Sequence, residues 1–220
     1  MGRTIVVGDI HGCFDELIDL IALIKLKRND RLIAVGDLIT KGPKSREVLD
    51  LFSSDPRFSS VVGNHDRIIR QKLRGEPVRL NKDQRKLLKE LGPNRERYFD
   101  FLRSLPFTID LGSHLVVHAG LRPGVDPDKQ MASDMTEIRT MGADPPKCRG
   151  IPWYAVYRGP QTILFGHWPA RQPRRAAWAI GLDTGCVYGN RLTAFVVETG
   201  EFISTPARQK YVGKALTIAG

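Results

Sequence analysis

The chain has 220 residues, enough for one domain with a full core, and its apolar and charged shares are ordinary for a globular protein. The formal net charge of +10 favours polyanionic partners such as phosphorylated small molecules or RNA, although excess Lys and Arg can also serve solubility alone. No apolar run approaches the ~20 residues of a membrane span, and the first residues lack the order of a signal peptide. We therefore expect a cytoplasmic protein without a membrane partner.

Short β-branched apolar runs recur along the chain, and most of them lead directly to a glycine. Continuous runs of this kind are typical of strands buried on both faces. A glycine at the strand end lets the backbone turn sharply and lets a ligand approach closely. The predicted strands cover residues 5–7, 32–35, 61–62, 115–117, 163–165, 179–182 and 192–197.

Apolar residues at helical spacing separate the first strands. Between the first two, positions 14–24 predict a helix and hence a β-α-β unit, and residues 45–52 predict another. Residues 67–106 predict a basic helical insert within a single domain of residues 1–220. Inside it, Asn81 and Gln84 have the spacing of a capping box at a helix start. The basic insert either attracts a polyphosphate or is a solvated helix face.

A loop rich in Gly and Pro is predicted over residues 141–152. The cysteines, Cys13, Cys148 and Cys186, are far apart and form no C-x-x-C pair. This spacing argues against a disulfide framework or a zinc-thiolate site, so we expect each cysteine to be a small buried hydrophobe.

Side chains that can ligate metals sit beside the strand-ending glycines. They are Asp9, His11, Asp37, Asn64, His118 and His167. Carboxylate, amide oxygen and imidazole together suit divalent ions such as Mn, Fe or Zn. Six donors exceed what one tetrahedral zinc needs and suit two ions with a bridging carboxylate. Any single one of these residues could be an ordinary capping group. However, four of the five histidines lie in these motifs and only His114 lies outside, so the joint pattern predicts a two-ion site.

Five motifs carry a family resemblance, and they occur in order along most of the chain. They are GDIHG (8–12), GDLITKGP (36–43), GNHD (63–66), HAG (118–120) and GH (166–167). In these motifs the chain resembles the calcineurin-like metallophosphoesterases of the phosphoprotein phosphatase superfamily. The resemblance implies an α/β sandwich of two mixed β-sheets flanked by helices, with the active site at the strand ends.

The resemblance also implies how two metal ions would be held. Asp9, His11 and Asp37 would hold one ion, and Asp37 would bridge to a second held by Asn64, His118 and His167. Mn²⁺ is the expected metal for both sites, with Fe, Zn, Co and Mg as alternatives.

His65 follows a ligand without being one, and the resemblance makes it the general acid. Imidazole chemistry suits that task, although a purely structural histidine is the alternative. The chain departs from the family at Thr40 and Lys41, where protein phosphatases usually carry Asp-Arg. Thr40 offers no carboxylate to orient His65, which leaves Asp66 or Asp183 as candidates for that role. Lys41 keeps the positive charge but loses the two-pronged guanidinium, and we still expect it to contact phosphate.

Three further segments narrow the resemblance to a branch. Residues 8–17, 165–168 and 182–189 are similar to the symmetrical bis(nucleosyl)-tetraphosphatases and their ApaH-like relatives. That branch offers a second cationic phosphate contact, for which Arg139 is the first candidate and Arg158 the second. Either arginine could instead be a solvated surface residue.

The expected reaction is hydrolysis of dinucleoside polyphosphates, with diadenosine tetraphosphate giving two ADP. Metal-activated hydroxide would attack phosphorus while Asn64, Lys41 and an arginine stabilise the oxygens and His65 protonates the leaving group. The alternatives are a serine/threonine or broad-specificity phosphoprotein phosphatase, removal of nucleotide caps from RNA 5′ ends, and a non-catalytic nucleotide- or RNA-binding module. We expect a monomer.

Overall fold

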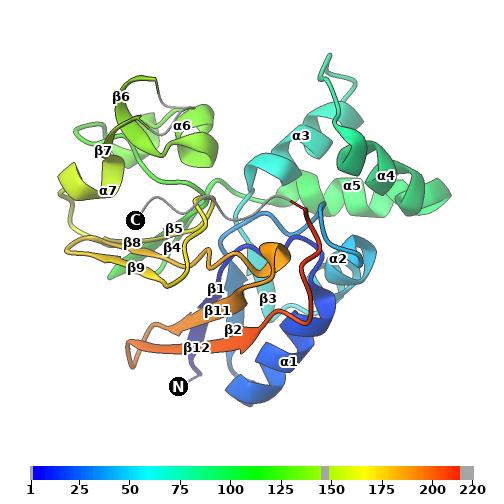
Figure 1. Ribbon diagram of the computed structural model, residues 1–220, viewed down its shortest axis with the longest axis horizontal. Coiled ribbons are helices and arrows are strands. Elements are labelled where there is room, and N and C mark those ends of the chain that lie inside the picture. Colours follow the sequence, from blue (N-terminus) through cyan, green and yellow to red (C-terminus); the bar gives the residue numbers. More distant parts are fainter. Residues whose placement is uncertain (1, 145–148, 214–220) are drawn as a thin grey trace.

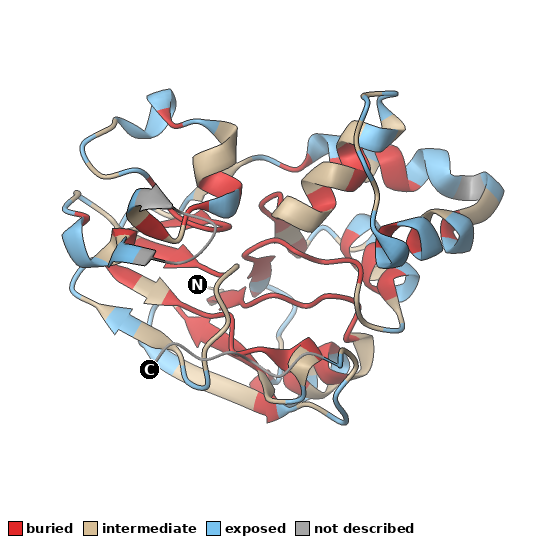
Figure 2. Ribbon diagram, turned by 45° about the horizontal axis from the view of Figure 1, so that its top comes forward, coloured by how far each residue is buried: buried red, intermediate tan, exposed pale blue. Residues whose placement is uncertain are grey.

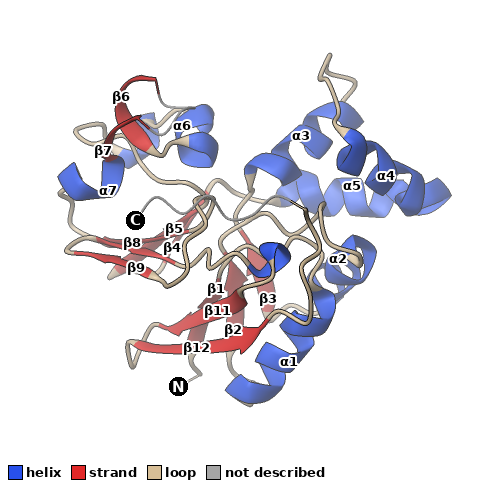
Figure 3. Ribbon diagram, viewed as in Figure 1, coloured by secondary structure: helices blue, strands red, loops and turns tan. Residues whose placement is uncertain are grey.

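The computed structural model describes residues 2–144 and 149–213, and two five-stranded mixed sheets form its centre (Figures 1 and 3). The first sheet has the order β12-β11-β1-β2-β3. Its strands are β1 (Thr4–Val7), β2 (Arg31–Ala34), β3 (Phe58–Ser60), β11 (Arg191–Val196) and β12 (Glu201–Pro206). β1 is parallel to β2 and antiparallel to β11, so it lies in the middle of the sheet.

The second sheet has the order β4-β5-β8-β10-β9. Its strands are β4 (Thr108–Asp110), β5 (His114–Val117), β8 (Thr162–Phe165), β9 (Arg174–Ala176) and β10 (Ala179–Gly181). The three central strands β5, β8 and β10 are parallel, and the two edge strands are antiparallel to their neighbours.

The alternation of side chains along β1 explains why its apolar run is continuous. Ile5 and Val7 point into the core between the first sheet and its helices, whereas Val6 points into the core between the two sheets. In that inner core Val6 packs with Ile33 of β2 and with Leu164 of β8. Both faces of the strand are buried, as its composition predicts, and Figure 2 shows the buried strands at the centre of the molecule.

Helices cover the outer faces of both sheets. The first sheet and the lobe beside it carry α1 (Phe14–Ile24), α2 (Ser45–Ser54), α3 (Asn64–Leu73), α4 (Lys82–Leu91), η1 (Gly92–Asn94) and α5 (Arg95–Ser104). The second sheet carries η2 (Pro127–Lys129), α6 (Ala132–Glu137), the hairpin β6 (Thr140–Asp144) and β7 (Arg149–Pro152), and α7 (Trp153–Val156). A short turn, η4 (Cys186–Tyr188), precedes β11. The predicted α/β class, with two mixed sheets flanked by helices, is confirmed.

Several local predictions are confirmed and two are wrong. Asn81 caps α4, because its side chain accepts from the Gln84 amide at 2.9 Å while Gln84 accepts from the Asn81 amide. Residues 61–62 form no strand, since β3 already ends at Ser60 and the chain leaves the ladder there. The predicted loop over 141–152 largely forms the β6-β7 hairpin, whose strands pair with an irregular register. Its polar, glycine-containing sequence lacks the apolar alternation that signals a strand.

Two of the three cysteines can be placed. Cys13 and Cys186 are free and fully buried, as predicted, and Cys148 lies outside the described residues. In the described part of the chain, no helix has both the length and the apolar character needed to cross a membrane.

Candidate metal centre

The loops that follow the central strands of both sheets meet at one edge of the sandwich, and their backbone is strained. Among the described non-glycine residues, six have a positive φ angle, and five of these lie in this group of loops. The five are His11, Asp37, Thr40, Lys41 and His167. Such conformations cost energy and persist where surrounding structure enforces them, most often at functional sites.

Asp37 lies at the centre of the cluster. Its Oδ2 atom is 3.4 Å from Nε2 of His11 and 3.6 Å from Nε2 of His118. Its Oδ1 atom accepts a hydrogen bond from the His65 amide at 2.9 Å. One carboxylate oxygen therefore lies between two imidazoles from different sheets, which is where a bridging ligand belongs.

The hydrogen bonds of His11 and His118 fix which ring nitrogen is unprotonated. Nδ1 of His11 contacts the carbonyl oxygen of Ile39 at 3.2 Å, and Nδ1 of His118 contacts that of Val35 at 2.8 Å. A carbonyl oxygen only accepts, so Nδ1 of each ring carries the proton and Nε2 presents a lone pair. Nε2 of His11 lies beside the Asp37 carboxylate and 2.8 Å from Nζ of Lys41, and Nε2 of His118 lies beside oxygens of Asp37 and Asn64, so both nitrogens favour a nearby cation.

His167 and Asn64 extend the same pattern. Oδ1 of Asn64 lies 3.0 Å from Nε2 of His118 and 3.1 Å from Nδ1 of His167. The backbone amide of His167 donates to both carboxylate oxygens of Asp9, at 3.1 and 3.2 Å. The structure thus brings all six predicted ligands into one cluster, and their donor chemistry fits divalent ions.

Buried carboxylates and imidazoles in the cluster shift one another's pKa values. Burial raises the pKa of Asp9 well above its ordinary value, and the nearby Asp183 and Asp37 carboxylates raise it further. Burial alone would also raise the pKa of Asp37, but the surrounding histidines, led by His118, hold it well below the usual range. Burial lowers the pKa of both His11 and His167, which keeps these imidazoles neutral and able to ligate. Two sets of three side chains in this cluster bring their ligand atoms close enough together to hold a cation. One set is Asp9, Asp37 and His118, and the other is His11, Asp37 and His65.

Two glycines leave room for the ligands. A Cβ atom at Gly63 would lie 2.2 Å from Oδ1 of Asp37, and one at Gly166 would lie 2.0 Å from Oδ1 of Asp9. Neither distance is sterically possible. The strand-ending glycines are thus needed because carboxylates occupy the space a side chain would fill.

His65 has a hydroxyl partner instead of a carboxylate. Its Nδ1 lies 2.7 Å from Oγ1 of Thr40, and burial lowers its pKa to about 4. The suggested supports are engaged elsewhere. Asp66 accepts from the amides of Gly63 and Leu38. Asp183 accepts from the amide of Gly185, and its carboxylate lies near that of Asp9. Among the described residues, the side chain hydrogen-bonded to the His65 ring is that of Thr40, and neither Asp66 nor Asp183 is hydrogen-bonded to it.

The metal-centre cavity has a volume of about 90 Å³, and its lining includes Asp183, which the sequence analysis named only as a possible support for His65, and Tyr188, which it did not name for the site. Lys41, a predicted member, places Nζ 2.8 Å from Nε2 of His11 and 5.4 Å from the ring centre of Tyr188. Asp183 directly follows the predicted strand 179–182, just as Asp9 closely follows its own strand, so its position in the sequence indicated a place at the site. No sequence pattern indicated such a place for Tyr188.

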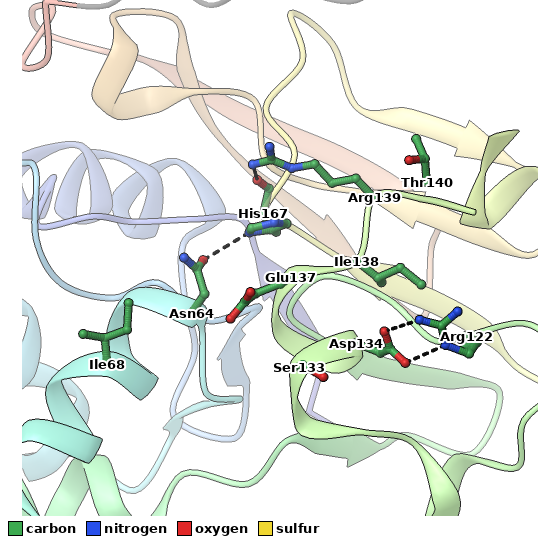
Figure 4. Close-up of a pocket in the computed structure, with 10 residues that line it drawn as sticks. All are labelled: Asn64, Ile68, Arg122, Ser133, Asp134, Glu137, Ile138, Arg139, Thr140 and His167. Atoms are coloured by element: carbon green, nitrogen blue, oxygen red, sulfur yellow. Dashed lines mark hydrogen bonds and ion pairs between the residues drawn. The ribbon is translucent and has the colours of Figure 1, made fainter. Parts of the chain in front are cut away.

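The two candidate arginines lie in different places. Arg139 lines the metal-centre cavity and also a larger cavity beside it, and its Nη2 donates to the His167 carbonyl at 3.2 Å (Figure 4). Arg158 is exposed at the end of α7, where it donates to the carbonyls of Ala155 and Tyr157. It lines neither cavity, so the structure does not bring the second candidate to the site.

Comparisons with known proteins agree with this geometry. Residues 2–196 match the sequence profile of the calcineurin-like phosphoesterases. The asymmetrical bis(5′-nucleosyl)-tetraphosphatase PrpE of Bacillus velezensis is 31% identical, over 94% of this chain and 93% of its own length. The symmetrical bis(5′-nucleosyl)-tetraphosphatase of Klebsiella pneumoniae is 29% identical, over 98% and 99%.

Solved structures show the same fold. A candidate diadenosine tetraphosphatase superposes with a TM-score of 0.82 at 35% identity, covering 94% of each chain. A protein serine/threonine phosphatase from Saccharomyces cerevisiae superposes with a TM-score of 0.64 at 15% identity, covering 94% of this chain and 79% of that one. At such low identity, the second likeness concerns the fold alone.

Proposed function

The chain belongs to the calcineurin-like phosphoesterases, as its motifs predicted, and from this premise we propose that it hydrolyses dinucleoside polyphosphates. It is a metal-dependent hydrolase of phosphoric esters or anhydrides. Beyond this activity, we propose a substrate, the metal ions and the residues that act on the phosphate. Relatives named for symmetrical and for asymmetrical cleavage both match along nearly the whole chain, so the site of cleavage is left to product analysis.

We assign the metal ligands from the cluster around Asp37. The first ion would be held by Asp9, His11 and Asp37, and the second by Asp37, Asn64, His118 and His167. When bound, two divalent ions, for which Mn²⁺ is our choice, supply a hydroxide near neutral pH and neutralise phosphate charge. Asp37 holds the two halves of the site together, because its carboxylate faces a histidine from each sheet.

The remaining polar side chains would act on the phosphate itself. Lys41 and Arg139 both line the cavity and carry positive charge that can stabilise the negatively charged oxygens of a pentacoordinate phosphorus in the transition state. Asn64 directs its amide at the same space, and its NH₂ group can donate to a phosphate oxygen. His65 would stand beside the leaving group, oriented by Thr40.

The Thr40–His65 pair is the observation that supports an anhydride substrate over a phosphoprotein. Hydrolysis of phosphoserine expels an alkoxide, a strong base that needs a proton in the transition state. A neutral threonine hydroxyl stabilises an imidazolium less than a carboxylate would. A nucleotide leaving group is a phosphate whose last pKa is about 6, so it departs as a stable anion with little protonation. A weakly supported acid is therefore adequate for a phosphoanhydride.

The experiment is a substrate panel run at several metal concentrations. Diadenosine tetraphosphate, a phosphoserine peptide, an aryl phosphate and 5′-capped RNA are each incubated with Mn²⁺, and kcat/KM is compared. We expect the dinucleotide to be the preferred substrate, and its products to be two ADP or ATP plus AMP. A phosphopeptide or capped RNA turned over with a higher kcat/KM than the dinucleotide would overturn the proposal in favour of that substrate.

A further inference from the structure

We propose that the larger cavity beside the metal centre binds one nucleoside of the dinucleotide and so selects nucleotides over other phosphate esters. The inference rests on the proposed function and adds the place where the substrate's nucleoside lies. The cavity lies between α3 and the segment from α6 to the start of β6 (Figure 4).

The sizes of the two cavities decide what each can hold. The metal-centre cavity, about 90 Å³, has room for a phosphate group with its ions, and a nucleoside must lie outside it. The neighbouring cavity has about 510 Å³, within the range of roughly 300–1,000 Å³ that is usual for small-molecule sites.

The two cavities share part of their lining. Asn64, Arg139 and His167 line both. In Figure 4 the guanidinium of Arg139 lies beside His167, and both residues line the two cavities. A polyphosphate chain that leaves the metal centre would pass this guanidinium, whose planar donors match phosphate oxygens.

The walls of the larger cavity are suited to an uncharged, flat base. Ile68 of α3 and Ile138 after α6 lie on opposite sides of it (Figure 4). The charges of Arg122 and Asp134 neutralise each other through two hydrogen bonds of 2.7 Å each. A base would therefore meet apolar side chains and a closed ion pair, without an unmatched charge on that wall.

Glu137 supplies the polar contact that a ribose would need. Its side chain is 56% exposed, and one carboxylate oxygen accepts from Nη1 of Arg67 at 3.0 Å. The carboxylate lies between Asn64 and Ile138 in Figure 4, on the path from the metal centre to the apolar walls. Carboxylates in nucleotide sites accept hydrogen bonds from ribose hydroxyls, and a carboxylate so placed can do the same here.

The first test fills the cavity. Ser133, in the first turn of α6, lines it and is only half-buried, so Ser133→Trp would place an indole where the nucleoside is expected. We expect kcat/KM for diadenosine tetraphosphate to fall at least about tenfold more than kcat/KM for p-nitrophenyl phosphate, mainly through KM. Calorimetric binding of ADP to the metal-loaded protein should weaken in parallel.

The matched control introduces the same indole elsewhere. Ser53 of α2 is exposed and lines a cavity of about 480 Å³ that shares no residue with the metal centre or the proposed nucleoside site. Ser53→Trp should leave the ratio of the two kcat/KM values as in the wild type. If Ser133→Trp unfolds at a lower temperature than the control, Ile68→Ala replaces it and should also weaken dinucleotide turnover selectively.

A second test addresses the ribose contact. Glu137→Gln should lower kcat/KM for the ribose dinucleotide about tenfold and leave that of the 2′,3′-dideoxy analogue nearly unchanged, because the loss of the Arg67 ion pair affects both analogues alike and only the ribose hydroxyls of the first lose a charged acceptor. Equal losses on both analogues would contradict a ribose contact.

Three results overturn the assignment of the cavity. They are an unchanged dinucleotide rate in Ser133→Trp, an equal loss on dinucleotide and aryl phosphate, and a loss confined to a phosphopeptide, which would assign the cavity to a peptide. Failure of the proposed function looks different, since the wild type itself would then hydrolyse the aryl phosphate and not the dinucleotide.

Discussion

Oγ1 of Thr40 lies 2.7 Å from Nδ1 of His65, and Thr40 holds a left-handed backbone with φ of 73° to bring the hydroxyl there. This conformation is costly for a β-branched residue, so the surrounding loop must enforce it. The loop is tied down by Ser45, whose hydroxyl accepts from the Thr40 amide at 2.9 Å. The orientation of His65 is therefore set by a strained, anchored hydroxyl and not by a carboxylate.

Thr40→Val removes that hydroxyl while keeping the shape of the side chain. We expect kcat to fall about three- to tenfold on an alkyl phosphate, the range for one lost hydrogen bond, and to change less on p-nitrophenyl phosphate. The difference arises because an alkoxide needs a proton from His65 and a nitrophenolate does not. Thr40→Ser, which retains the hydroxyl, is the control. A uniform loss on both substrates would instead indicate general damage to the loop.

Asp37→Asn tests the centre of the metal cluster. The amide keeps the size of the side chain but removes the negative charge that faces His11 and His118. Wild-type protein at a Mn²⁺ concentration of about 100 Kd should gain about 2.7 kcal/mol, or roughly 5–10 °C in melting temperature. The variant should lose most of this gain and most of its activity. Melting temperature and bound metal are measured with and without a chelator; two ions retained by the variant would contradict the bridging role.

The ligand cluster could be predicted from the sequence because its residues lie at or just after the ends of predicted strands, and the folded protein keeps them there. Asp9, Asp37 and His167 closely follow a buried strand and a glycine, and His118 directly follows a buried strand of the second sheet. Central strands of one sheet end at a common edge, so ligands far apart in sequence meet without further information. Asp183 follows the same rule, and its place beside Asp9 was predictable on that ground.

Other features depend on distances that no local pattern encodes. The contact between Thr40 and His65 joins residues 25 positions apart through a strained backbone. Arg139 and Arg158 have equivalent chemistry, but Arg139, between α6 and β6, donates to the His167 carbonyl at the metal centre, whereas Arg158, after α7, donates to carbonyls of its own surface segment. Arg70 of the basic insert is similarly turned inward: it is 8% exposed and lies against the Phe107 ring.

Gly166→Ala tests why a strand-ending glycine is needed at the site. The new methyl group would collide with Oδ1 of Asp9, so the carboxylate must move away from the position where we place the first ion. We expect metal affinity to fall about 10- to 100-fold, as for other changes that displace a ligand's support. Gly213→Ala is the control, because no atom of the described residues lies within 4 Å of its added Cβ and its φ is not positive. Unchanged metal titrations in Gly166→Ala would show that Asp9 is not a ligand.

Asp30→Asn tests a carboxylate that serves stability, far from the metal centre. Burial alone would raise the pKa of Asp30, but hydrogen bonds from Arg3 and from the Lys27 amide hold it well below its ordinary value of 3.8. Because the folded pKa is below the unfolded one, the stabilisation is complete above about pH 5 and is lost progressively as the pH falls through and below about 4.

The variant should therefore lose about 1–3 kcal/mol of unfolding free energy at pH 7, the usual range for hydrogen bonds to a charged group. The deficit should shrink steadily as the pH is lowered from 5 towards 2, because the carboxylate of the unfolded wild type binds a proton there that the folded protein excludes, which lowers the stability of the wild type alone. Urea unfolding at several pH values measures both effects. Asp126→Asn is the control, since Asp126 pairs with Lys129 in the open, with a side chain 70% exposed, and its loss should change little at any pH. A deficit of constant size from pH 7 to pH 2 would mean that the charge of Asp30 contributes nothing, and that only the geometry of its hydrogen bonds matters.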